Sequence, residues 1–156
     1  MTFALRRAGA DDLDAIMAIE STTFENDAWS RDMMAAELTS QHTYYLVAER
    51  AGVEAYAGLF APQRSLQADI QTIAVGKSAR RQGLGRVLMQ SLIGEARERG
   101  ATEVFLDVRA DNPGATALYE SLGFEAIAVR PGYYQPDNVD AVVMRLHIPK
   151  PETGVA

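Results

Sequence analysis

The chain contains no cysteine. This absence excludes disulfides, thiolate nucleophiles, cysteine-ligated zinc and iron–sulfur clusters. Histidine is nearly absent as well, because His42 and His147 are the only two and no other ligand type is spaced around them. We therefore expect no metal site. No Gly-x-Ser-x-Gly turn occurs either, so a serine hydrolase lacks its nucleophile turn.

Long apolar runs are also missing. No stretch approaches 18 consecutive apolar residues, and the opening segment, which carries Arg6 and Asp11, lacks the apolar core of a secretory signal. We expect no membrane partner and a cytoplasmic location. The formal net charge of −6 argues against a nucleic-acid partner, because proteins that track phosphate backbones usually present a net basic face.

The 156 residues, of which 47% are hydrophobic, suit one globular domain. We expect residues 1–148 to form that single domain. The segment 149–156, PKPETGVA, has the composition of a disordered tail. No internal repeat or linker divides the chain.

Hydrophobic periodicity predicts a mixed α/β (α+β) fold. Strands are expected at residues 3–6, 43–48, 55–60, 68–75, 103–108, 124–129 and 141–146. Helices are expected after Asp12, after Ser30, over about residues 82–99, and from Pro113 to Gly123. Residues 131–137 are expected to form a loop. This order predicts a seven-stranded, mostly antiparallel sheet with helices on both faces.

The most informative stretch is the basic turn between the strand at 68–75 and the long helix. Residues 70–94 include four basic side chains and no carboxylate, although the whole chain is acidic. The turn reads Arg81-Gln82-Gly83-Leu84-Gly85-Arg86. Unpaired N–H groups at a helix start bind anions, and glycines let phosphate oxygens approach the backbone. The turn therefore predicts a diphosphate site, with a merely solvated basic turn as the alternative.

Two familiar nucleotide motifs do not fit this region. Gly76-Lys77-Ser78 imitates the end of a Walker A loop, but Gln71 stands where that motif requires a glycine. The pair Gly83 and Gly85 lacks the third glycine of a dinucleotide fingerprint, since Leu88 occupies its place.

These residues resemble a known family. Ile73-Ala74-Val75 and Arg81-Gln82-Gly83-Leu84-Gly85, followed by Asn112 and by Leu118-Tyr119-Glu120-Ser121-Leu122-Gly123-Phe124, look like the acetyl-CoA-binding half of a GCN5-related N-acetyltransferase (GNAT). The resemblance covers about residues 3–147 and implies the GNAT fold, with acetyl-CoA as co-substrate. It implies that the backbone of Ile73, Ala74 and Val75 pairs with pantetheine, that the turn from Arg81 to Arg86 holds the diphosphate, and that Asn112 also contacts the cofactor.

A narrower pattern points to one subfamily, the ribosomal-protein-alanine N-acetyltransferases. It consists of Ala28-Trp29-Ser30, the run from Leu106 to Asn112, and Arg130-Pro-Gly-Tyr133-Tyr134. The implied acceptor is a protein N-terminus, namely the N-terminal alanine of a small-subunit ribosomal protein. Trp29, Tyr133 and Tyr134 are candidates for binding it. Tyr133 and Tyr134 can equally be packing aromatics, and a tryptophan at such a position is more often a packing residue.

The resemblance implies that Asp107 is the general base and Tyr119 the general acid. The chemistry needs both roles, because the acceptor ammonium must lose a proton and the departing thiolate must gain one. Asp107 departs from the family pattern, where glutamate is expected, and its reach is about 1 Å shorter. Asp69 on the preceding strand is a rival base. Without the cofactor motif, Tyr119 would be taken as a core aromatic.

Other functions remain open at this point. The acceptor can be a lysine side chain or a small amine such as a polyamine or an antibiotic. The domain can also bind acetyl-CoA as a sensor without catalysis. Within the enzymatic interpretation, the lack of cysteine favours direct attack of the amine on the thioester.

Overall fold

The structure is a computed structural model that describes residues 2–24 and 26–149. Its strands are β1 (Ala4–Arg7), β2 (Thr43–Glu49), β3 (Val53–Phe60), β4 (Gln67–Val75), β5 (Glu103–Arg109), β6 (Glu125–Tyr134) and β7 (Val139–His147). Its helices are α1 (Leu13–Thr23), α2 (Arg31–Thr39), α3 (Leu84–Glu98) and α4 (Pro113–Ser121), with short 3₁₀ turns η1 (Ala10–Asp12) and η2 (Lys77–Ala79). Residues 150–156, which make up most of the tail expected to be disordered, lie outside the described residues.

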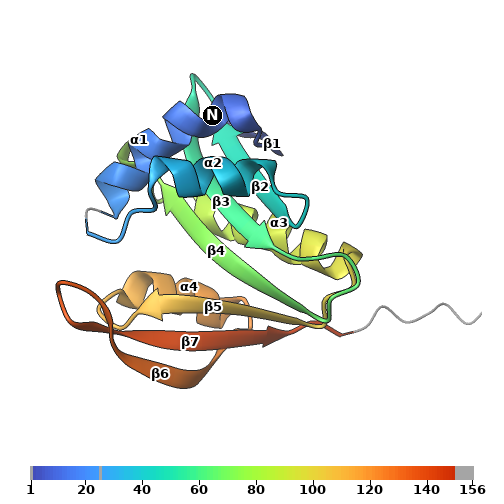
Figure 1. Ribbon diagram of the computed structural model, residues 1–156, viewed down its shortest axis with the longest axis vertical. Helices are drawn as coiled ribbons and strands as arrows, with labels where there is room; N and C mark the ends of the chain where they lie inside the picture. The colour runs from blue at the N-terminus through green and yellow to red at the C-terminus, as the bar shows by residue number, and fades with distance from the viewer. Residues whose placement is uncertain (1, 25, 150–156) are drawn as a thin grey trace, which may run out of the picture.

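The strands form one seven-stranded sheet in the order β1-β2-β3-β4-β5-β7-β6. Every neighbouring pair is antiparallel except β4 and β5, which are parallel. Helices α1 and α2 cover one face of the sheet, and α3 covers the other (Figure 1). The expected fold class is therefore confirmed, down to the number of strands.

Each face of the sheet buries its own apolar cluster. One cluster packs Ile16, Ile19 and Met34 of α1 and α2 against β2, β3 and β4. The larger cluster packs α3, through Leu88 and Leu92 among others, against the opposite face. Alternating burial along β4 accounts for this two-sided packing, because successive side chains of a strand point to opposite faces.

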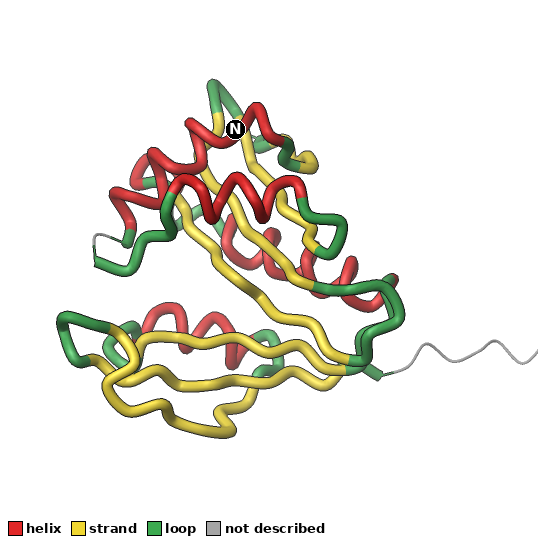
Figure 2. The backbone as a smooth tube through the Cα atoms, viewed as in Figure 1, coloured by secondary structure: helices red, strands yellow, loops and turns green. Residues whose placement is uncertain are grey.

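Strands β4 and β5 diverge shortly after they begin. Their register pairs Gln67 with Glu103 and ends where Asp69 meets Phe105. Beyond that point the two strands separate, so the facing edges of residues 70–75 and 106–109 have no ladder partner in each other (Figures 1 and 2). This divergence opens the middle of the sheet.

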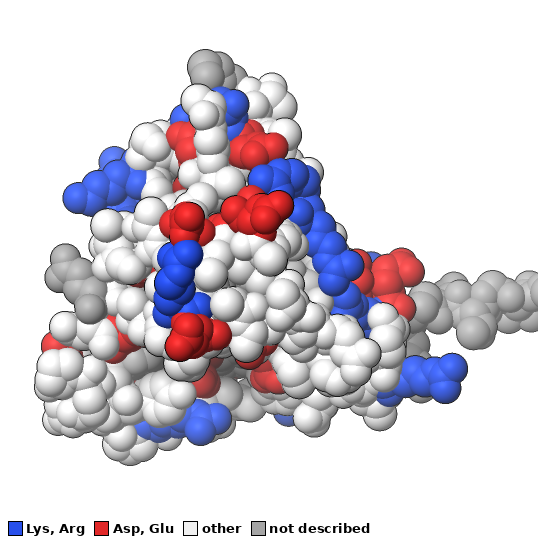
Figure 3. Space-filling model, turned by 45° about the horizontal axis from the view of Figure 1, so that its top comes forward, with Lys and Arg blue, Asp and Glu red and all other residues white. Residues whose placement is uncertain are grey.

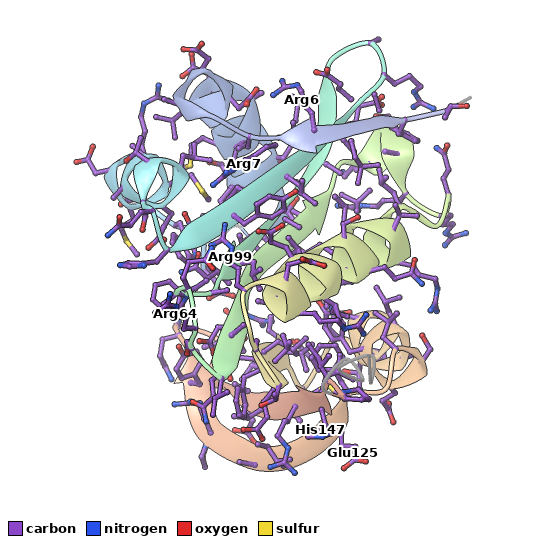
Figure 4. All side chains as sticks on the ribbon, turned by 90° about the vertical axis from the view of Figure 1, so that its right-hand side faces the viewer. Arg6, Arg7, Arg64, Arg99, Glu125 and His147 are labelled. Carbon is purple, nitrogen blue, oxygen red and sulfur yellow. The ribbon has the colours of Figure 1, made fainter. Side chains whose placement is uncertain are left out.

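Backbone and arginine contacts fix the closed end of this opening. Thr102 N donates to Leu66 O at 2.8 Å, and Arg64 N donates to Arg99 O at 2.8 Å. The side chain of Arg99 is buried, and its Nη1 donates to the carbonyl of Ala61 at 3.1 Å. Figure 4 shows Arg64 and Arg99 together near the end of α3. These contacts join the segments that lead into β4 and β5, just before the point where the two strands diverge.

The expectation of a loop over residues 131–137 is wrong. Strand β6 continues to Tyr134, which pairs with Val139. The register shifts between Arg130 and Tyr134, and this irregularity accommodates Pro131 and Gly132 on an edge strand. The aromatic pair Tyr133-Tyr134 favours the extended backbone. Only residues 135–138 connect β6 to β7.

Acidic and basic side chains lie next to one another on the face in Figure 3. Arg6 forms ion pairs with both Asp12 and Glu49. Within residues 2–24 and 26–149, no helix is long and apolar enough to cross a membrane.

Candidate active site

A cavity of about 830 Å³ lies where β4 and β5 diverge. Its lining includes Arg80, Arg81 and Gly83 of the turn that precedes α3. Asp107 and Tyr119 line it as well. We call this the first cavity. It joins the basic turn to the carboxylate and the phenol that the sequence singled out.

The start of α3 has the geometry of an anion site. Gly83 is the N-cap of the helix and has a φ of 74°, in the left-handed region that glycine adopts without strain. A Cβ at Gly83 would meet nothing within 4 Å, so the backbone conformation rather than lack of space favours glycine there. Arg81 also has a positive φ, of 63°. The first N–H groups of a helix have no partner within the helix, and this turn lines the first cavity, so it can bind an anion there.

The side chains of this turn divide into two groups. Arg81, Gly83, Leu84 and Gly85 line the first cavity, as does Arg80, whose Nε donates to Val75 O at 2.9 Å. The other predicted members, Gln82 and Arg86, are not among the residues that line it. The amide of Gln82 donates to Ser78 O at 3.3 Å, and the guanidinium of Arg86 donates to Ser121 Oγ at 2.6 Å.

The divergence of the strands exposes the edge of β4. Ile73, Ala74 and Val75 line the first cavity along this edge. Their backbone groups that face β5 have no ladder partner there. Asn112 also lines the cavity, but its Oδ1 accepts a hydrogen bond from Ala115 N at 3.1 Å as the N-cap of α4. Asn112 is therefore both the N-cap of α4 and part of the cavity lining.

A second cavity, of about 840 Å³, adjoins the first. Trp29, Tyr133, Tyr134 and Arg130 line it, so it brings together the three aromatic residues that the sequence interpretation selected. Asp107 and Tyr134 are among the residues that line both cavities. The two hollows therefore meet beside the candidate base.

The two candidate bases lie on one face of the sheet. Asp69 pairs in register with Phe105, and Asp107 follows two residues later on the same face of β5. Desolvation and, second, the charge of Asp107 raise the pKa of Asp69. Asp69 lines only the second cavity, whereas Asp107 lines both and lies 3.6 Å from Arg130 Nε.

Two tyrosines, Tyr119 and Tyr134, line the first cavity. Burial raises the pKa of Tyr119 to about 12, so its hydroxyl stays protonated at neutral pH. Burial also raises the pKa of Tyr134 to about 12, with the charge of Asp107 as the next cause. A protonated phenol is the form that can donate a proton or a hydrogen bond.

Sequence analysis missed Glu20, a buried carboxylate that lines the first cavity. It accepts hydrogen bonds from Trp29 N at 2.9 Å, from Thr72 Oγ1 at 3.4 Å and from the hydroxyl of Tyr56. Desolvation raises its pKa, and the bonds from Trp29 and Thr72 partly oppose that shift. One available signal was its spacing, because Glu20 stands four residues after Ile16 on the apolar stripe of α1.

The histidine and carboxylate side chains of the described residues do not suggest a metal site. Across the part of the chain that the structure describes, no group of three or more histidine, cysteine or carboxylate residues could hold an ion.

Comparison with known proteins gives the class of this fold and site. The model of the acetyltransferase (GNAT) family matches residues 13–124, which is more than half of the chain. The chain belongs to the acetyltransferase (GNAT) family. The resemblance inferred from the basic turn and the segment after Asn112 is thus confirmed.

Within the family, the chain resembles enzymes named RimI. It is 36% identical to the N-alpha-acetyltransferase RimI of Mycobacterium tuberculosis over 123 residues, which is 77% of this chain and 76% of that protein. The crystal structure of the ribosomal-protein-S18-alanine N-acetyltransferase from Escherichia coli superimposes with a TM-score of 0.86 at 32% identity, covering 99% of both chains.

A more distant structure shows the same fold with a ligand. The yncA protein of Salmonella typhimurium was solved with its cofactor acetyl-CoA and has a TM-score of 0.81 at 23% identity, covering 97% of this chain and 96% of that one. Sequence matches to the first curated relatives span only 38% and 57% of those proteins' own lengths.

Proposed function

We propose that this protein is an acetyl-CoA-dependent N-alpha-acetyltransferase whose acceptor is a protein N-terminus. The observation that carries the proposal is the meeting of the two cavities beside Asp107. One cavity leads to a turn suited to a diphosphate, and the other is lined by aromatic and acidic side chains. An acetyl donor and an amine entering from opposite sides would meet at a carboxylate.

The first cavity fits the donor by its chemistry. The N–H groups at the start of α3, with Arg80 and Arg81, suit a diphosphate. The edge of β4 from Ile73 to Val75 has no ladder partner in β5 and offers backbone groups that can bond the amides of pantetheine as an added strand does. In this proposal the predicted Gln82 and Arg86 support the turn, and Asn112 contacts the donor through its remaining amide hydrogens.

The proton transfers are assigned to two side chains. Asp107, directly or through a water molecule, removes a proton from the acceptor ammonium, since only the neutral amine can attack a carbonyl. Tyr119, whose pKa is raised to about 12 and which, like an ordinary phenol, is protonated at neutral pH, donates to the departing thiolate. Acetyl-CoA supplies the thioester, and the amine attacks it directly.

The acceptor is proposed to be an N-terminal α-amine. An α-amine has a pKa of about 7.7 to 8.0 against about 10.4 for lysine, so deprotonating lysine costs roughly 3.5 kcal/mol more. A short aspartate is a modest base and suits the easier task. The names of the relatives from M. tuberculosis and E. coli support an N-terminus, and the latter supports the alanine of ribosomal protein S18.

One observation favours a second acceptor. The second cavity contains three carboxylates, those of Asp27, Asp69 and Asp107, against the single guanidinium of Arg130. Such an acidic lining would also attract a polyamine. The acceptor panel therefore includes spermidine.

The test is a panel of acceptors assayed by release of free coenzyme A. It contains peptides that begin with alanine, serine, glycine or methionine, an N-terminally acetylated peptide with an internal lysine, and spermidine. The proposal predicts the highest kcat/KM for a free N-terminal alanine. A preference for the blocked lysine peptide would make a lysine side chain the acceptor, and a preference for spermidine would make a polyamine the acceptor. Binding of acetyl-CoA without turnover would indicate a sensor. The cytoplasmic location stays a prediction.

A further inference from the structure

Arg109, the last residue of β5, connects three segments that are distant in sequence. Its Nη1 lies 2.6 Å from Asp27 Oδ2, in the connection between α1 and α2. Its Nη2 lies 3.1 Å from Asp137 Oδ2, in the connection between β6 and β7. Its Nε and Nη2 also bind the carboxylate of Asp111, at 3.0 and 3.1 Å.

The same guanidinium positions an aromatic side chain. Arg109 Cζ lies 5.1 Å from the ring centroid of Tyr134, within the range of a cation–π contact. Asn26 adds a direct tie between two of the segments, because its Nδ2 lies 3.3 Å from Asp137 Oδ1. The Arg109 side chain is only 23% exposed, so water screens these contacts less than it screens an open surface pair.

An isolated ion pair on the surface stabilises a protein by little. In this protein, by contrast, one guanidinium is shared by several carboxylates. Three aspartates converge on one cation, and without it Asp27, Asp111 and Asp137 would repel one another. Only arginine offers five donors in a rigid planar fork, which can bond several carboxylates at once. The guanidinium therefore determines whether the three segments stay together.

These contacts lie where the two cavities meet. Asp27 and Tyr134 line both cavities, and Arg109 lines the first. We propose that Arg109 is a positioning residue that assembles the acceptor wall, by holding the α1–α2 and β6–β7 connections and Tyr134 in place. This inference rests on the proposed function, in which the second cavity receives the amine. It assigns Arg109 no role in binding acetyl-CoA.

The first test compares the KM of the acceptor peptide with the KM of acetyl-CoA in a variant of Arg109. In Arg109→Gln we expect the KM of an alanine peptide to rise at least about fivefold, while the KM of acetyl-CoA changes less than about twofold. Arg6→Gln is the matched control, because Arg6 also binds two carboxylates, Asp12 and Glu49, yet lines neither cavity. Equal rises in both constants for Arg109→Gln, or the same separation in Arg6→Gln, would overturn the proposal.

The second test does not depend on activity. Hydrogen exchange of the amides of residues 26–30 and of residues 135, 137 and 138 is expected to be at least about tenfold faster in Arg109→Gln, with β2 unchanged. Unchanged exchange in both segments would overturn the proposal. Arg109→Lys keeps the charge but not the fork, so full rescue by lysine would contradict it as well. If the parent protein acetylates no amine, the proposed function fails, and the exchange result alone decides whether Arg109 assembles this wall.

Discussion

Asp69 and Asp107 project from one face of two parallel strands, at the point where those strands separate. Asp69 is the last residue of β4 that pairs with β5, and Asp107 is the first residue on that face beyond the pairing. The charge of Asp107 contributes to the raised pKa of Asp69, after desolvation. The two carboxylates therefore differ in environment, and we assign the base role to the one that lines both cavities.

The first prediction separates these two candidates. Asp107→Asn should lower kcat by about 10²- to 10³-fold, because it removes the general base, with little change in the KM of acetyl-CoA. Asp69→Asn, the matched isosteric change, should retain kcat within about tenfold. Steady-state kinetics with an alanine peptide decide this. The reverse order of effects would transfer the base role to Asp69.

A related prediction concerns the charge interaction itself. In Asp107→Asn the pKa of Asp69 should fall toward its usual value of 3.8, because one cause of its elevation is removed. It should remain somewhat raised, since desolvation is the larger cause. Carbon-detected NMR titration of the Asp69 carboxyl measures this shift. An unaltered pKa would mean that the two carboxylates do not interact.

Tyr119 is predicted to act as an acid in the transition state. Tyr119→Phe should lower kcat by about 10- to 100-fold while the KM values change little, because the ring that packs against Phe124 is retained. Since the pKa of Tyr119 is raised to about 12, its ionisation should not limit the rate at any lower pH. Kinetics across the pH range test both points, and full activity of the phenylalanine variant would return Tyr119 to a packing role.

Glu20 should make stability depend on pH. Its pKa is raised above the usual 4.5, chiefly by desolvation, so the folded protein holds this proton more tightly than the unfolded chain. Its contribution to the free energy of unfolding is therefore full below pH 4.5 and is lost as pH rises through the raised pKa.

Glu20→Gln isolates this contribution. The amide retains hydrogen bonds and removes the charge, so its stability relative to the parent should be greater at about pH 8 than at about pH 4. Denaturant unfolding at both values measures the difference. Parallel pH profiles for the two proteins would show that Glu20 does not titrate differently on folding.

Gly58 is predicted to be intolerant of any side chain. A Cβ there would lie 2.2 to 2.6 Å from ring atoms of Tyr45, whose hydroxyl donates to Gln71 Oε1 at 2.8 Å. Gly58→Ala should therefore reduce the free energy of unfolding by about 1–3 kcal/mol, because the ring must move within a packed core. Gly94→Ala is the control, since nothing lies within 4 Å of its Cβ position.

The order of elements could be predicted from local patterns, but their mutual placement could not. Period-two and helical spacing identified the strands and helices, and Ser30 caps α2 as its side chain suggested. The loop expected after Arg130 is a strand, because pairing with β7 outweighs the local signals of Pro131 and Gly132.

The site shows the same limit. The basic turn is contiguous, so its glycines and arginines could be recognised directly. Arg109 and Asp27 are 82 positions apart, and Glu20 meets Thr72 across 52. Such contacts depend on how the α1–α2 connection and the sheet pack together, which no local spacing encodes. The acceptor side could therefore not be assembled from the sequence.

The most direct test of the central claim uses a single peptide that begins with a free alanine and carries an internal lysine. After incubation with acetyl-CoA and the protein, fragmentation mass spectrometry locates the acetyl group. The account predicts acetylation of the α-amine, and loss of this product in Asp107→Asn. Acetylation of the lysine ε-amine, or an α-acetylated product that Asp107→Asn forms at the parent rate, would contradict it.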